Sequence, residues 1–121
     1  MKIVVAPPRR FHALSRKQVE AIFAILPKEF SVPIREFIIQ EGYRCHEPLE
    51  YYRPAKRVTF AMPVDEKTDL TTREAVIALL IGIARIRAKS KFAQPLSRLE
   101  RESYSEFVKE WAERALKAAL T

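Results

Sequence analysis

The chain has 121 residues, enough for one ordinary domain, and its 48% hydrophobic content predicts a packed globule rather than a disordered chain. Its net charge of +7 allows nucleic acid, an acidic protein or an anionic surface as a partner without choosing among them. Two glycines exclude the glycine-rich phosphate loops, and one cysteine excludes an internal disulfide and a CxxC site. The apolar stretches are too short for a signal peptide or a membrane span, so we expect a single cytoplasmic domain over residues 1–121.

The first half of the chain predicts a strand, a helix and a second strand. Residues 2–6 (KIVVA) have the composition of a short strand. Ser15 and Gln18 have the spacing of a capping box, so a helix should follow Ser15 and end at Pro27. Residues 32–40 alternate apolar and polar side chains and predict the second strand.

The middle of the chain predicts a hairpin and a buried helix. Residues 50–53 and 57–63 form two strand-like segments joined by a tight connection. A second capping box, at residues 71–74, predicts a helix start at about Thr72, and residues 75–86 are apolar almost all round, which is typical of a buried helix. Gly82 inside this helix predicts a close backbone contact.

The last segment predicts an amphipathic helix whose start is ambiguous. Both Ser97 with Glu100 and Ser103 with Glu106 have the spacing of a capping box. The expected order is therefore strand, helix, strands, helix, helix. Strands grouped between helices indicate an α+β fold, with three helices and a small, mostly antiparallel sheet of three or four strands.

Few residues could carry chemistry. Cys45 and His46 are the only adjacent pair of soft and ionisable groups, and His12 is the only other histidine. Neighbouring side chains on an extended chain diverge, so we expect a loop with no metal, no cofactor and no catalytic group. An enzyme that works without a metal would need Cys45, His46 and His12 to converge in one pocket.

Two groups of basic residues are candidates for a binding patch. The first lies in the hairpin, beside Tyr51 and Tyr52, and the second follows the apolar helix; together they comprise Arg53, Lys56, Arg57, Arg87, Lys89 and Lys91. Cations interleaved with aromatic rings can bind single-stranded nucleic acid. Cations near a helix C-terminus are also favoured by the helix dipole alone, and no RNA-recognition or helix-turn-helix signature accompanies these groups.

The layout resembles that of the minimal zincin metallopeptidases, the ImmA/IrrE-like and lethal-factor-like groups. In those domains a helix and strand lead to a hairpin, a polar loop, a buried helix bearing HExxH and a later helix bearing a glutamate ligand. The segments that carry the resemblance are Leu26-Pro27, Tyr51-Tyr52-Arg53-Pro54, Val58-Thr59-Phe60-Ala61, the run from Leu79 to Arg85, and the run from Glu106 to Glu113.

The resemblance implies a degenerate peptidase site. Ile81 and Arg85 stand where the two zinc histidines would be, and Gly82 stands where the general base would be. These residues cannot supply zinc catalysis, which needs two imidazoles and a carboxylate on one helix. Arg85 is expected to pair with Glu106 instead. The resemblance therefore implies a non-catalytic domain that binds a protein or an extended peptide; a small basic nucleic-acid-binding protein is the alternative.

Overall fold

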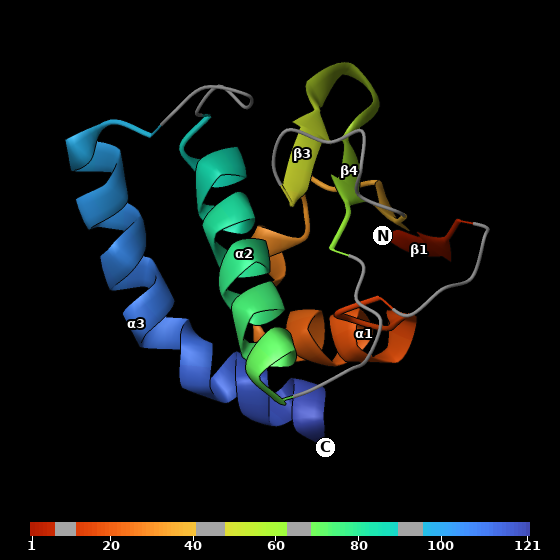
Figure 1. The fold of residues 1–121 in the computed structure, drawn as a ribbon. Helices are drawn as coiled ribbons and strands as arrows, with labels where there is room; N and C mark the ends of the chain where they lie inside the picture. Colours follow the sequence, from red (N-terminus) through yellow and green to blue (C-terminus); the bar gives the residue numbers. More distant parts are fainter. Residues whose placement is uncertain (7–11, 41–47, 63–68, 90–95) are drawn as a thin grey trace.

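The computed structural model describes residues 1–6, 12–40, 48–62, 69–89 and 96–121. In chain order, the elements are β1 (Lys2–Val5), α1 (Arg16–Ile25), the short 3-10 helix η1 (Lys28–Phe30), β2 (Glu36–Ile39), β3 (Leu49–Tyr52), the 3-10 turn η2 (Arg53–Ala55), β4 (Arg57–Phe60), α2 (Asp69–Arg87) and α3 (Arg98–Leu120). Three α-helices and one four-stranded sheet confirm the α+β class and the order of elements (Figure 1).

The sheet is mixed, which corrects the expectation of a mostly antiparallel one. Its strand order is β1-β2-β4-β3. β1 with β2 and β2 with β4 are parallel pairs, and only β3 with β4 is antiparallel. The crossover that a parallel pair needs is provided by α1 between β1 and β2. β3 lies at the outer edge of the sheet, so β4 returns from the hairpin to pair with β2.

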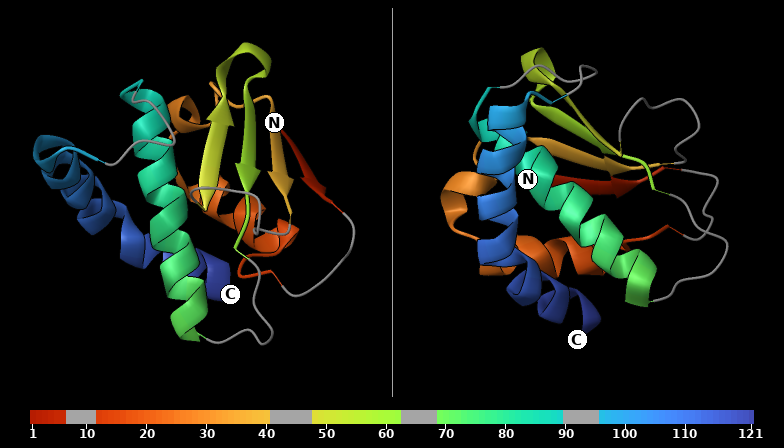
Figure 2. Two further views of the ribbon diagram at one scale, coloured as in Figure 1. Left: turned by 45° about the horizontal axis from the view of Figure 1, so that its top comes forward. Right: turned by 60° about the vertical axis from the view of Figure 1, so that its left-hand side comes forward.

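One face of the sheet carries the core. Phe37, Ile39, Val58 and Phe60 alternate along β2 and β4 and are buried in one core cluster with residues of α1 and α2. α3 packs against α1 and α2, so it forms an outer layer of helix (Figure 2). The opposite face of the sheet is not covered by any helix in the described part of the chain.

Aromatic contacts join η1 to the helices. The Phe30 ring packs edge-on against Phe107 and Trp111 of α3, with centroids 5.4 and 5.8 Å away. On the α2 side, the Arg87 guanidinium lies 4.3 Å from the Phe30 centroid. Such contacts each contribute about 0.5–1.5 kcal/mol beyond simple burial. They fix η1 beside the C-terminal end of α2.

The helix starts follow the sequence signals in part. The expected capping box at Ser15 is present: its hydroxyl accepts from the Gln18 N–H at 3.2 Å, and Gln18 Oε1 accepts from the Ser15 N–H at 2.8 Å. α3 begins after Ser97, which also forms a capping box, so Ser103 lies inside the helix. α2 already includes Asp69, so Thr72 lies within α2 and does not start it.

The expected second strand is shorter in the structure. It spans Glu36–Ile39 rather than residues 32–40. Pro33 has no N–H to donate, so it cannot continue a strand that is paired on both sides. The hairpin is confirmed, with β3 and β4 paired in the register Leu49 to Phe60 and Tyr52 to Arg57.

Ser15→Ala is expected to lower the free energy of unfolding by about 1 kcal/mol, because the substitution removes a helix cap. Ser103→Ala is the matched control, because Ser103 is exposed inside α3 and alanine is the better helix former. It should leave stability unchanged or raise it by a few tenths of a kcal/mol. Urea unfolding of both variants measures the difference; an equal loss in both would contradict the observed start of α3.

Candidate functional site

Gly82, the residue that the resemblance puts at the general-base position, is packed against β3. Gly82 is buried in α2, where Leu49 of β3 lies over it. A Cβ atom on residue 82 would lie 2.6 Å from both terminal methyl carbons of Leu49 and 2.8 Å from its Cγ. Gly82 therefore makes the close contact that was expected, but the contact is with a side chain and not with a backbone. A side chain larger than glycine cannot fit here unless Leu49 moves.

Ile81 and Arg85, which the resemblance puts at the zinc-ligand positions, lie one helical turn apart on α2. Ile81 is half-buried, and Arg85 is only 3% exposed. An arginine guanidinium has N–H donors and no acceptor, so this position offers no metal-binding lone pair. The ligand types needed to bind zinc are therefore missing from both positions.

Glu106, the expected partner of Arg85, has a neighbour of opposite charge on its own helix. Glu106 is on the solvent side of α3, where its side chain is 79% exposed and its carboxylate lies 3.7 Å from Lys109 Nζ. Arg85, in contrast, is in the core. The structure pairs Glu106 with Lys109 on the same helix.

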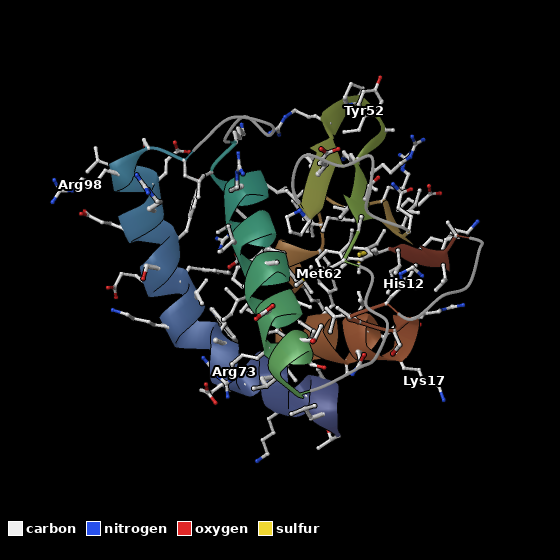
Figure 3. The ribbon with its side chains drawn as sticks, viewed as in Figure 1. His12, Lys17, Tyr52, Met62, Arg73 and Arg98 are labelled. Atoms are coloured by element: carbon white, nitrogen blue, oxygen red, sulfur yellow. The ribbon has the colours of Figure 1, made fainter. Side chains whose placement is uncertain are left out.

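The candidate cysteine–histidine cluster falls mostly outside the described residues, which exclude Cys45 and His46. His12 is buried and is followed by Ala13, whose N–H donates to the Met62 carbonyl at 2.8 Å. Figure 3 shows His12 at the β1 end of the molecule. Within the described ranges, no three His, Cys, Asp or Glu side chains lie close enough together to hold a metal ion.

The outer edge of the sheet is formed by β3. The Ala61 N–H donates to the Pro48 carbonyl at 2.7 Å, and the register places these two residues opposite each other. Because hydrogen-bonded pairs alternate along an antiparallel ladder, the backbone of Leu49 turns its N–H and C=O away from β4. In the described part of the chain β3 pairs with β4 alone.

The two groups of candidate basic residues lie at the same end of the molecule. The hairpin turn and the C-terminal end of α2 are both at the top of Figure 1. Residues 28–36 join them: Glu29 Oε1 lies 3.6 Å from an Arg87 terminal nitrogen, and the Arg35 N–H donates to the Lys56 carbonyl at 2.8 Å. Arg53, Lys56, Arg57, Arg87 and Lys89 are all exposed. Lys91 lies outside the described residues.

Residues 28–36 add two cations that the sequence did not indicate. Lys28 and Arg35 are exposed at this same end. Each is the only cation in its stretch of sequence, so no cluster of positive charges indicates it. Only the contacts of η1 with α2 and of Arg35 with Lys56 place them beside the other cations.

No family model, no curated protein and no solved structure was found to match this chain. Among the helices of the described residues, none combines the length and the apolar character needed to cross a bilayer.

Proposed function

We propose that this chain is a non-catalytic zincin-like domain that binds an extended segment of a partner protein along β3. The observation that carries the proposal is the contact between Leu49 and Gly82. In the zincin layout the helix position of Gly82 holds the general base, which faces the substrate. Here an edge-strand side chain packs directly on Gly82, and the buried Arg85 would stand in place of a ligand.

Binding by strand addition does not need the residues of peptidase catalysis. An extended peptide that pairs with an edge strand gains main-chain hydrogen bonds, and pockets for alternate side chains give specificity. β3 is an edge strand with the N–H and C=O of Leu49 directed outward. It also lies beside α2, as the edge strand of a zincin lies beside its helix. These features support β3 as the binding edge.

The non-catalytic part of the proposal is tested by the zinc content of the purified chain. Protein dialysed at neutral pH against buffer with micromolar zinc should retain far less than one zinc per chain, because Ile81 and Arg85 provide no ligand. Mass spectrometry of the metal measures this. Stoichiometric zinc that survives dialysis would refute the idea of a degenerate site.

The binding part is tested by selection from a phage-displayed library of random twelve-residue peptides on the immobilised 121-residue chain. We expect enriched peptides rich in β-branched residues and free of proline at their centres, because they must pair with β3. If no peptide is enriched above the unselected library, the proposed function is wrong.

A second function is favoured by the exposed side of the hairpin. Tyr52 is 57% exposed at the hairpin end of the molecule, next to Arg53 (Figure 3). A ring flanked by cations can stack on a base while the cations neutralise phosphates. This alternative predicts binding of a twenty-residue oligothymidylate that weakens steeply as salt rises. The absence of any shift at low salt would remove it.

A further inference from the structure

One end of the molecule carries a dense excess of positive charge. We define the basic end as residues 28–36, 53–57 and 87–89, which the contacts of Glu29 with Arg87 and of Arg35 with Lys56 bring together. These segments contain seven cations, which are Lys28, Arg35, Arg53, Lys56, Arg57, Arg87 and Lys89, and two carboxylates, Glu29 and Glu36. The balance at this end is thus +5.

The two carboxylates neutralise only two of the cations. Glu29 pairs with Arg87 at 3.6 Å, and Glu36 pairs with Arg57 at 3.5 Å. The other five cations form no ion pair with any residue that the structure describes. Five exposed like charges in one region raise the local positive potential and attract an anionic partner.

The basic end continues directly from the outer edge of the sheet. Arg53 follows the last residue of β3, and its guanidinium lies 5.4 Å from the Tyr51 ring centroid. The Tyr51 hydroxyl donates to the Pro33 carbonyl at 2.6 Å, which ties β3 to residues 28–36. A peptide strand paired with β3 would therefore lie beside these cations where it passes the end of the sheet edge.

Two exposed apolar side chains lie within the same region. Val32 is 71% exposed, and Tyr52 is 57% exposed. An apolar contact surrounded by cations suits a segment that mixes apolar and acidic side chains, because rim charges set the partner and apolar groups add buried area.

We infer that the segment bound along β3 belongs to an acidic protein region, with Asp and Glu side chains placed against Arg53, Lys56 and their neighbours at the basic end. This inference rests on the proposed function. A peptide fits better than a single-stranded nucleic acid for two reasons. First, the edge of β3 offers backbone hydrogen-bonding groups that match a peptide. Second, proteins that bind single strands stack successive bases on several aromatic rings, whereas residues 53–57 contain no aromatic ring and Tyr52 precedes them in the sequence.

The test uses the 121-residue chain, two charge variants and the displayed twelve-residue library. Arg53→Glu with Lys56→Glu reverses two charges at the basic end. Lys17→Glu with Lys117→Glu is the matched control: both lysines are exposed on α1 and α3, and Lys17 lies far from the hairpin in Figure 3. Each double variant changes the net charge from +7 by four units, to +3.

Peptides selected on the unmodified chain should be enriched in Asp and Glu several-fold over the library. The strongest of them, labelled with fluorescein, should bind Arg53→Glu/Lys56→Glu about tenfold more weakly and the control variant within about twofold of the unmodified chain. Replacing its Asp and Glu by Asn and Gln should also weaken binding about tenfold.

Three other outcomes can be distinguished from this expected result. Selected peptides without an acidic excess, which bind both variants equally, would overturn this inference and leave the proposed function standing. A library that yields no binder would overturn the proposed function and the inference with it. An oligothymidylate that binds through Arg53 and Lys56, while the selected peptides do not depend on them, would assign the basic end to nucleic acid.

Discussion

Phe37→Ala is expected to lower the free energy of unfolding by about 3–5 kcal/mol, the usual range when a large aromatic side chain is removed from a core. Phe37 lies on β2, is fully buried, and packs against the rings of Phe23 and Phe60 at centroid distances of 5.9 and 6.0 Å. Its loss leaves a cavity between the sheet and α1. Urea unfolding monitored by circular dichroism measures the change.

Ile38→Ala is the control for that prediction. Ile38 follows Phe37 on β2 but points to the opposite face of the sheet, where it is half-buried. Its truncation should lower the free energy of unfolding by about 1 kcal/mol, because less apolar area is lost. A loss at Ile38 as large as that at Phe37 would show that both faces of the sheet are covered equally.

Gly82→Leu is expected to lower the free energy of unfolding by about 2 kcal/mol. Overpacking against Leu49 costs about 3 kcal/mol, and the better helix propensity of leucine returns about 1 kcal/mol. Leu49→Ala alone should cost about 3 kcal/mol through the cavity that it leaves. In the double variant the leucine introduced on α2 can fill this cavity, so the loss should be at least about 1.5 kcal/mol smaller than the sum of the two single losses.

Ile3→Ala provides the control for this double-mutant cycle. Ile3 is buried on β1, at the opposite edge of the sheet, about 14 Å from β3 at the usual strand spacing. Combined with Gly82→Leu, it should give a loss equal to the sum of the single losses within about 0.5 kcal/mol. Additive losses for Leu49 with Gly82 would contradict the contact between β3 and α2.

Local signals in the sequence predicted the elements whose causes are local. Three features depend on neighbours within a few positions: the capping box at Ser15, the tight connection before Arg57 and the apolar surface of residues 75–86. The spacing of residue types was therefore sufficient to predict them. The start of α3 was ambiguous because Ser97 and Ser103 carry the same capping signal. The structure uses Ser97, so the helix already extends over residues 98–102 before the position of Ser103 is reached.

The features that the sequence missed depend on residues far apart along the chain. The parallel pairing of β2 with β4 requires β3 to lie at the sheet edge, and nothing within any one strand specifies that order. The contact of Leu49 with Gly82 and the position of Arg35 beside Lys56 are of the same kind. The pairing of Arg85 with Glu106 came from the zincin layout and stays a prediction; in the structure Glu106 is exposed beside Lys109.

The glycine in α2 connects the fold to the proposed function. Gly82 allows Leu49 to pack closely, and in the proposed zincin-like layout this contact lies at the position of the catalytic carboxylate. β3 is an edge strand, and its C-terminal end leads directly into the cations of residues 53–57. The proposed binding edge and the charged end are therefore continuous along the chain.

The central claim is that an extended partner segment pairs with β3. Amide hydrogen exchange measured by NMR, with and without the strongest library-selected peptide, tests it at single residues. The Leu49 amide, which is directed away from β4, should exchange at least about tenfold more slowly in the complex, and the Thr59 amide, which the ladder alternation turns toward β3, should be unchanged. An unchanged Leu49 amide in a saturated complex would contradict strand addition at this edge.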